Sequence, residues 1–254
     1  MTKIIINGAK GKMGKSIVAC ATNHPNIEVV GQVDVGDDLA KVVADCDVVM
    51  DFSSPTPVLE ILLRCSDAKK AVVMGTTGHS DREMGIIQHY STFIPIVKAT
   101  NFSTGVNVLF WLTRNAAEIL GPEFDIEIVE THHRLKKDAP SGTAKTLAGI
   151  LAEVRNGQFQ AKVHDRQRGD AYTRPGREGN LGARDSSEIG IHAIRGGDVV
   201  GDHTVMFLAN GERVELSHKA SSRETFAQGA FRAVEWVVKQ PPGLYDMMDV
   251  LELK

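Results

Sequence analysis

The sequence predicts an α/β protein made of a parallel-sheet domain and a second, α+β domain. From the N-terminus to Lys98, short apolar strands alternate with helical segments, which is typical of a parallel sheet with right-handed crossovers. After Ser187 the strands follow one another directly, and Asn210-Gly211 is typical of a tight antiparallel hairpin between Thr204–Ala209 and Glu212–His218. We therefore expect two kinds of sheet in one chain.

The composition is that of a globular protein with a substantial core. Of 254 residues, 42% are hydrophobic, enough for one large core or two modest ones. No apolar run reaches about eighteen residues and the N-terminal one is too short for a signal peptide, so we expect a cytoplasmic protein without a membrane partner. A net charge of −3 with mixed signs argues against a nucleic-acid partner. Three widely spaced cysteines, Cys20, Cys46 and Cys65, favour reduced core residues over a disulfide or zinc set.

The first strand runs directly into a glycine-rich turn. The turn reads Gly8-Ala9-Lys10-Gly11-Lys12-Met13-Gly14 and stands between a strand at Lys3–Asn7 and a helix. A second strand, Ile27–Val33, ends in Asp34, twenty residues after Gly14. Strand, turn, helix, strand and acid together predict the dinucleotide-binding unit of a Rossmann-type domain, with the pyrophosphate on the helix N-terminus and the acid on the ribose. The alternative is an ordinary glycine-rich turn.

Polar residues follow two further strands of the predicted sheet. Strands are expected at Asp47–Asp51, Ala71–Met74 and Phe93–Lys98. Helices are expected between them, at Val58–Ser66 and Asp81–Tyr90. Gly75-Thr76-Thr77 follows the second of these strands and Ala99-Thr100-Asn101-Phe102 follows the third. Both runs fall at the carboxyl ends of parallel strands, where such sheets bind ligands. On position alone, turn and cap chemistry explains them equally well.

A cluster of basic residues lies between an expected strand, Phe124–Glu130, and an expected helix headed by Ser141. It contains two imidazoles, an arginine and two lysines: His132, His133, Arg134, Lys136 and Lys137. Free N–H groups in the first turn of the helix would add positive potential, so the cluster predicts an anion-binding site. The adjacent histidines point to opposite sides if extended, and therefore have different tasks. A solvated basic loop with structural histidines is the alternative.

The run from Glu130 to Ala144 resembles the signature of the dihydrodipicolinate reductase family. Other matching runs are Gly8–Gly14, Glu188–His192, Arg195–Asp198 and Gly243–Met247. The resemblance implies an α/β fold with a Rossmann-type nucleotide domain, residues 1–102 and 220–254, and an inserted α+β substrate and oligomerisation domain, residues 103–219. A final helix, expected at Ser222–Lys239, would then return to pack on the first domain.

The resemblance implies reduction of the cyclic dicarboxylate 4-hydroxy-tetrahydrodipicolinate to tetrahydrodipicolinate, in the diaminopimelate route to lysine, with NADPH or NADH as cofactor. His132 and Lys136 would be catalytic, while His133, Gly142 and Thr143 would bind the substrate. The cofactor would contact Gly8 to Met13, Asp34, Gly75 to Thr77, and Ala99 to Phe102. No metal site is visible in the sequence. The resemblance implies a homotetramer, to which the Thr204–His218 hairpin would supply a surface.

Residues near the predicted ribose site give opposing indications about the choice between NADH and NADPH. Asp34 accepts hydrogen bonds from ribose hydroxyls and repels a 2′-phosphate, and no arginine follows it to hold that phosphate. Lys10 and Lys12 in the glycine-rich turn could attract the same phosphate, although lysine is a point charge and not a bidentate clamp. We therefore expect both NADH and NADPH to be used.

Two other functions would use the same nucleotide domain. Another Rossmann-type NAD(P)-dependent dehydrogenase, such as a semialdehyde dehydrogenase, needs a cysteine nucleophile in a loop, and the three cysteines here lie in apolar segments. A non-catalytic protein that senses the dinucleotide redox state would have no need of the basic cluster.

Some features are assigned no chemistry. Leu135 stands where some family members have a histidine, and leucine cannot transfer protons, so we expect no role for this position. The histidines in expected strands, His192, His203 and His218, are interpreted as structural. The polar stretch Arg155–Ser187 is interpreted as a mobile excursion or as a surface for another subunit.

Overall fold

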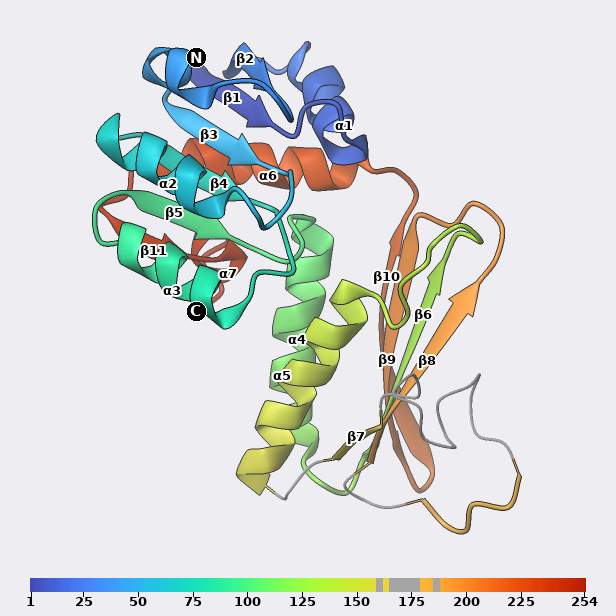
Figure 1. Cartoon of the computed structure of the whole chain (residues 1–254). Helices are drawn as coiled ribbons and strands as arrows, with labels where there is room; N and C mark the ends of the chain where they lie inside the picture. Colours follow the sequence, from blue (N-terminus) through green and yellow to red (C-terminus); the bar gives the residue numbers. More distant parts are fainter. Residues whose placement is uncertain (159–161, 165–178, 185–187) are drawn as a thin grey trace. The chain divides into compact units, whose positions relative to one another are not determined.

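The chain folds into two compact units (Figure 1). The computed structural model describes residues 1–158, 162–164, 179–184 and 188–254. The first unit combines Met1–Thr104 with Arg223–Lys254, and the second is the continuous segment Gly105–Ser222. In the part of the chain that the structure describes, no helix is both long and apolar enough to span a membrane.

The first unit contains a six-stranded parallel sheet of order β11-β5-β4-β3-β1-β2. Its strands are β1 (Thr2–Asn7), β2 (Ile27–Val33), β3 (Val48–Asp51), β4 (Ala71–Met74), β5 (Pro95–Lys98) and β11 (Gly243–Tyr245). Every residue of β3 and β4 is buried, because a parallel sheet is covered on both faces. The predicted Rossmann-type sheet is confirmed, and the carboxyl ends of its strands share one edge.

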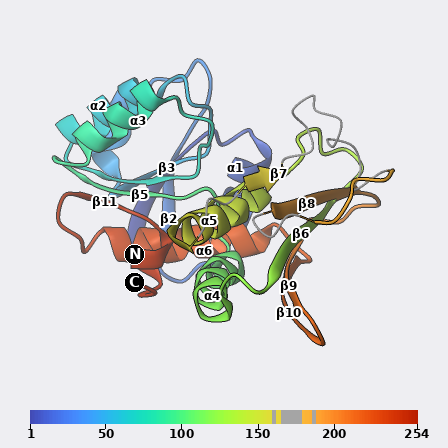
Figure 2. The ribbon, with the colours of Figure 1, turned by 90° about the horizontal axis from the view of Figure 1, so that it is seen from below.

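Helices cover both faces of this sheet (Figure 2). They are α1 (Lys12–Ala21), α2 (Val58–Asp67), α3 (Asp81–Tyr90), α6 (Glu224–Val237) and α7 (Met247–Val250), with short 3₁₀ turns η1 (Leu39–Lys41) and η2 (Val43–Asp45). Helices α2 and α3 lie on the face opposite α6 (Figure 2), and α1 shares the apolar cluster of α6. Each face buries its own apolar cluster, so the sheet is fixed from both sides.

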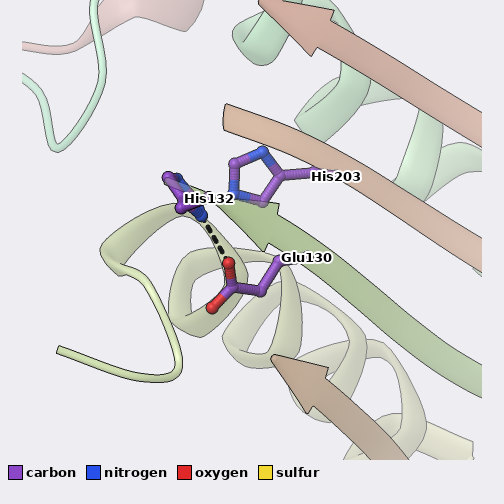
Figure 3. Close-up of side chains that lie close together, drawn as sticks. All are labelled: Glu130, His132 and His203. Atoms are coloured by element: carbon purple, nitrogen blue, oxygen red, sulfur yellow. Dashed lines mark hydrogen bonds and ion pairs between the residues drawn. The ribbon is translucent and has the colours of Figure 1, made fainter. Parts of the chain in front are cut away.

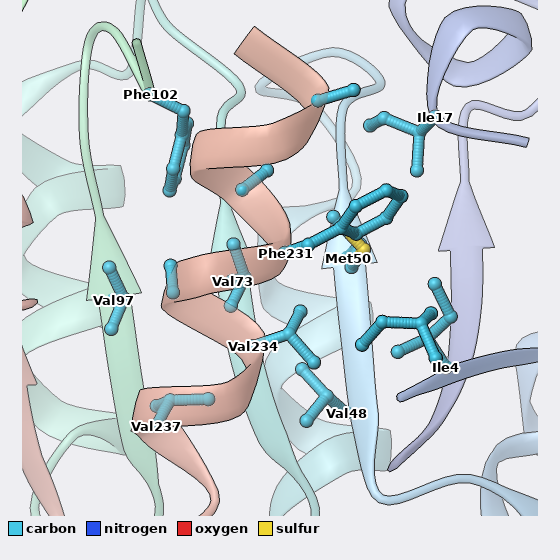
Figure 4. Packing of buried hydrophobic residues seen from close by; sticks show 14 of the residues in the cluster. Ile4, Ile17, Val48, Met50, Val73, Val97, Phe102, Phe231, Val234 and Val237 are labelled. Atoms are coloured by element: carbon cyan, nitrogen blue, oxygen red, sulfur yellow. The ribbon is translucent and has the colours of Figure 1, made fainter. Parts of the chain in front are cut away.

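The last long helix, α6, returns from the end of the chain to the core of the first unit. Its Phe231 and Val234 pack with Ile4 and Met50 of the sheet (Figure 4). A Cβ atom at Gly229 would lie 1.8 Å from the carbonyl oxygen of Phe102, so only glycine permits this approach. The prediction that the final helix packs on the first domain is confirmed.

The second unit contains a five-stranded mixed sheet of order β10-β9-β6-β8-β7. Its strands and helices are β6 (Asp125–His132), β7 (Lys162–His164), β8 (Glu188–Arg195), β9 (Gly201–Ala209), β10 (Glu212–Ala220), α4 (Thr104–Leu120) and α5 (Gly142–Gln158). The central strand β6 is parallel to β8 and antiparallel to β9. Helix α5 packs on β6, β7 and β8, and an ion pair of 2.6 Å between Arg114 and Glu153 joins it to α4.

The structure confirms most of the predicted elements and refines a few. The hairpin between β9 and β10 forms, and Gly211 takes a positive φ of 89° in its turn. Strand β6 extends to His132, beyond the predicted end at Glu130, so the first imidazole of the basic cluster belongs to the sheet. The predicted excursion over Arg155–Ser187 begins with the end of α5 and contains β7, but most of it lies outside the described residues.

Candidate active site

The glycine-rich turn of the first unit is tightly constrained. Gly8 has a φ of +81°, and a Cβ atom there would lie 2.6 Å from the carbonyl oxygen of Phe52. A Cβ atom at Gly14 would lie 2.2 Å from the carbonyl oxygen of Gly8. Gly11 precedes α1 without a side-chain cap, so the N–H groups of the first turn remain for a ligand. The residues present fit the pyrophosphate of a dinucleotide at this helix N-terminus.

Asp34 connects the end of β2 to the glycine-rich turn. Its Oδ2 accepts a hydrogen bond of 2.7 Å from the backbone N–H of Lys10, and its Oδ1 accepts one of 2.9 Å from Val35. These two donors, Lys10 first, lower the pKa of Asp34 below its ordinary value. The side chain is therefore a fixed carboxylate beside the turn, where it can accept hydrogen bonds from a ribose.

The other residues predicted to bind cofactor come together at the carboxyl ends of β4 and β5. The backbone N–H of Ala99 donates to the carbonyl of Met74, which holds the two strand ends side by side. The ring of Phe52 bridges them: it lies 5.6 Å from the ring of Phe102, and a Cβ atom at Gly75 would meet it at 2.1 Å. Phe102 is buried, so its ring supports this edge from within.

Thr76 supports the same edge through a buried polar network. Its hydroxyl donates to Oδ2 of Asp51 at 2.7 Å and accepts from the backbone N–H of Ser53 at 3.0 Å. Asn7 and Ser53 donate to the other oxygen of Asp51, at 2.8 and 2.6 Å. The hydroxyl of Thr76 is therefore committed to the protein, and so is its backbone N–H, which donates to the carbonyl of Asp51 at 3.2 Å. The Thr77 side chain, by contrast, is exposed.

In the second unit, the buried carboxylate of Glu130 organises the start of the basic cluster (Figure 3). Arg195 donates to both of its oxygens, at 2.9 and 2.8 Å, and the backbone N–H of Ser141 donates at 3.1 Å. Nδ1 of His132 forms a further hydrogen bond to it. Burial alone would raise the pKa of Glu130, but the bonds from His132 and Arg195 lower it to about 2. The group is thus an ionised hub that orients an imidazole and a guanidinium.

The register of three strands explains how this group forms. Alternate residues of β6, ending in Glu130 and His132, point to the face that α5 covers. His132 is opposite Arg195 on β8, and Glu130 is opposite His203 on β9. Arg195 was noted only as part of a run that matches the family, and His203 was interpreted as a structural histidine, so sequence reasoning missed the place of both in this cluster. A buried glutamate within an apolar alternation is the signal that could have revealed the cluster.

His203 lies between the hub and the start of α5. The residue is 3% exposed, its Nε2 lies 3.0 Å from Oγ of Ser141, and its ring centroid lies 5.2 Å from that of His132. Burial first, and His132 second, lower the pKa of His203 to about 4. The imidazole is therefore neutral at pH 7. Ser141 also accepts a hydrogen bond from the backbone N–H of Ala144, which confirms it as the N-cap of α5.

The remaining predicted residues lie on the loop from β6 to α5. Nζ of Lys136 is 3.0 Å from Asp138, a partner that sequence reasoning did not consider. The backbone of His133 bonds to Val199 at 2.7 Å, which holds the loop against the turn after β8. A Cβ atom at Gly142 would meet nothing within 4 Å, so the start of α5 is open at this residue, whereas Thr143 beside it is buried. Leu135 points into solvent with 78% of its surface exposed.

Glu130, His132 and His203 also form a set of metal-ligand type, with ligand atoms within 4.8 Å of one another. Both oxygens of Glu130 are already bound to the guanidinium of Arg195. A cation in this place would have to displace a fixed positive charge, so the donor set fits an ion pair better than a metal ion.

A parallel sheet with a glycine-rich turn and a fixed acid, joined to a unit with clustered imidazole and ammonium groups, defines a dinucleotide-dependent oxidoreductase. Comparison with known proteins gives the family. Residues 2–102 match the N-terminal model and residues 105–251 the C-terminal model of dihydrodipicolinate reductase. The chain belongs to the dihydrodipicolinate reductase family, whose members use NADH or NADPH, and the predicted family, oxidoreductase class and cofactor class are confirmed.

Relatives match over their full length. Proteins named 4-hydroxy-tetrahydrodipicolinate reductase are 48% identical in Akkermansia muciniphila, over 100% of this chain and 99% of the relative, and 43% identical in Hahella chejuensis, over 100% of both. A dipicolinate-bound dihydrodipicolinate reductase from Paenisporosarcina sp. TG-14 has a TM-score of 0.78 at 26% identity, with 98% of each chain covered. A diaminopimelate dehydrogenase from C. glutamicum, at a TM-score of 0.55 and 13% identity, shares the fold alone.

The cysteines do not suit the alternative dehydrogenase chemistry. Cys46 and Cys65 are buried, and burial raises the pKa of Cys46 to about 11 and that of Cys65 further. Burial also raises the pKa of the partly covered Cys20. A nucleophilic thiolate requires the opposite shift, so a cysteine-dependent semialdehyde dehydrogenase finds no support in these residues.

Proposed function

We propose that this chain reduces 4-hydroxy-tetrahydrodipicolinate to tetrahydrodipicolinate with NADH or NADPH, in the diaminopimelate route to lysine. The observation that carries the proposal is the β6–α5 loop, which contains several cationic residues and leads from the Glu130 hub to the start of α5, where Gly142 is open. A substrate with two carboxylates suits such a place, because helix N–H groups and cations both favour anions. The relatives named above are named for this reaction.

The first unit, with boundaries near residues 102 and 220, is proposed to bind the cofactor. The turn from Gly8 to Met13 would hold the pyrophosphate, and Asp34 would accept from the adenosine ribose. The nicotinamide side would meet Gly75, Thr76 and Thr77 on one strand end and Ala99, Thr100, Asn101 and Phe102 on the other. Bound there, the reduced nicotinamide supplies a hydride, and the protein supplies position and charge.

The second unit, near residues 103–219, is proposed to hold the substrate and to supply the proton. Gly142 would offer its backbone N–H and Thr143 its N–H and hydroxyl to one carboxylate, with His133 as a further contact. The substrate takes up one hydride at C4 and one proton at the neighbouring carbon, and releases water. Lys136, held by Asp138, and His132, held by Glu130, are the proposed proton-carrying groups.

We further propose that the protein acts in the cytoplasm as a homotetramer joined through the sheet of the second unit. The three free cysteines suit a reducing compartment. Along β9, buried residues such as Val205 and Phe207 alternate with half-buried ones. The half-buried residues lie on the face of the sheet turned away from α5, and this face is the proposed contact surface. Thr204 and Ser217 pair across the hairpin on that surface, at 2.8 Å. Sedimentation of the purified protein tests this assembly, and a monomer would contradict it.

The function is tested by incubating the protein with reduced cofactor and freshly generated substrate. Absorbance of the reduced cofactor should fall in proportion to substrate added, and not with substrate or protein alone. A protein that binds NADH without consuming it in the presence of substrate would instead act as a dinucleotide sensor. A protein that oxidises the cofactor with other substrates only would belong to another dehydrogenase class.

A further inference from the structure

The turn after β2 carries a second carboxylate that is fixed beside Asp34. Asp37 accepts a hydrogen bond of 2.9 Å from the backbone N–H of Asp34, and its own N–H donates to the carbonyl of Asp34 at 3.0 Å. Gly36 closes the turn with a φ of +95°, a conformation that side chains rarely adopt. The two carboxylates therefore lie on one short turn, and both are ordered by the backbone.

The same turn also draws in a lysine of the glycine-rich loop. Nζ of Lys10 lies 4.0 Å from Oδ2 of Asp37, while its backbone N–H is bound by Asp34. Both side chains of this pair are largely exposed, at 74% and 50%, so the pair is weak and can be separated by a stronger anion. Lys10 is the cation that the sequence offers as a partner for a 2′-phosphate, and here its ammonium faces another acid.

We propose that Asp37 is a second determinant of cofactor choice, which acts against NADPH by adding negative charge and by holding the ammonium of Lys10. The inference rests on the proposed cofactor site. Asp34 places the ribose hydroxyls at the end of β2, so a 2′-phosphate enters next to Asp37. That phosphate must overcome two carboxylates and recruit Lys10 away from one of them. NADH carries no such group and is indifferent to Asp37.

The neighbouring Asp38 provides a matched control. Its side chain accepts the N–H of Ala40 at 3.0 Å and caps η1, so it carries the same charge one residue further on with another structural task. Asp37→Asn and Asp38→Asn each remove one negative charge. Asparagine retains a side-chain oxygen that can accept the same backbone N–H in either place. A difference between the two variants therefore reports position and not net charge.

Binding is measured by titrating protein fluorescence with NADH and NADPH, and with the fragments AMP and adenosine 2′,5′-bisphosphate. Asp37→Asn should tighten NADPH and the bisphosphate about five- to tenfold at low salt, with NADH and AMP changed less than about twofold. The gain should shrink at high salt, because exposed charges are screened. Lys10→Ala introduced into Asp37→Asn should remove most of the gain.

Three results would overturn the inference: no change in the NADPH/NADH affinity ratio, an equal change in Asp38→Asn, or a gain that survives Lys10→Ala undiminished. Asp37→Ser, which also offers an acceptor to Asp34, serves as a second variant, and thermal melts check that each protein is folded. Failure of the proposed cofactor site is a separate outcome. In that case the unaltered protein binds neither NADH nor AMP, whereas a failure of the Asp37 inference leaves NADH binding intact.

Discussion

The proposed cofactor site of the first unit and the proposed substrate site of the second unit are built from different kinds of groups. In the first unit, the cofactor edge is largely backbone, with tight glycines, free N–H groups of α1 and one carboxylate, Asp34, held by neighbouring amides. In the second unit, the substrate side is built from buried side chains, with Glu130 between a guanidinium and an imidazole. A site of backbone depends on local chain geometry, whereas a site of buried charges depends on strands that meet from distant parts of the sequence.

Substitutions of the proposed catalytic side chains should have the largest effects, and the quantity that they change should be kcat. Lys136→Ala should lower kcat about 10²- to 10⁴-fold, the range for loss of a general acid, with little change in NADH affinity. Lys137→Ala removes a similar charge from an exposed neighbour and is the matched control. Steady-state kinetics and cofactor titration measure both quantities. Near-normal kcat in Lys136→Ala would remove this residue from the proposed mechanism.

The buried hub should matter most for stability. Glu130→Ala leaves Arg195 and His132 without their counter-charge, and loss of one partner of a buried pair costs about 3–5 kcal/mol. Trp236→Phe leaves Trp111 on α4 as the fluorescent reporter of the second unit, since the chain has two tryptophans. Urea unfolding followed at Trp111 should shift strongly in Glu130→Ala and hardly at all in Asp34→Ala. Equal midpoints for the two variants would mean that the halves do not differ in this way.

Acid should destabilise the second unit through His203. Its pKa is about 4 in the folded protein and about 6.5 in the unfolded chain, so the unfolded chain binds the proton more readily. The stability that depends on the neutral imidazole is complete above about pH 6.5. It is lost as pH falls toward 4, by an amount on the order of 3 kcal/mol. Glu130 adds a second loss at lower pH, between about 4.3 and 2, because its folded pKa lies below the unfolded value.

His203→Gln should reduce the loss of stability between about pH 6.5 and 4, and leave the loss through Glu130 at lower pH unchanged. Urea midpoints of the second unit, followed at Trp111 from pH 7 to pH 4, measure the difference. A pH slope as steep in His203→Gln as in the unaltered protein would assign the acid sensitivity to other groups.

Substitutions at the backbone-built edge should have the smallest effects. Asp34→Ala should weaken NADH by about tenfold or less, because one partly exposed carboxylate is lost while the glycine turn remains. Lys10→Ala and Lys12→Ala should weaken NADPH more than NADH, and more at low salt. KM values for both cofactors at two salt concentrations measure these effects. An unchanged NADPH/NADH ratio in both lysine variants would contradict compensation by the turn lysines.

The same contrast explains what the sequence predicted. The glycine-rich turn, Asp34 and the strand rhythm are local patterns, and the structure has them where they were expected. The basic loop and the Ser141 cap were also readable, because they lie on one short segment. Arg195 and His203 were not, since their place beside Glu130 depends on the register of β8 and β9 against β6. The ion pair between Lys136 and Asp138 was missed for a simpler reason. The spacing of residues in the sequence does not determine which rotamer a lysine side chain adopts.

The discontinuity of the first unit has a consequence for synthesis of the chain. Its sheet needs β11, and its core needs α6, and both belong to the last segment, Arg223–Lys254. The second unit is one continuous stretch that leaves the ribosome earlier. The second unit of a nascent chain can therefore be complete while the first unit still lacks its edge strand, β11, and its covering helix, α6. Translation order thus makes the first unit, although it contains the N-terminus, the last part of the protein to be completed.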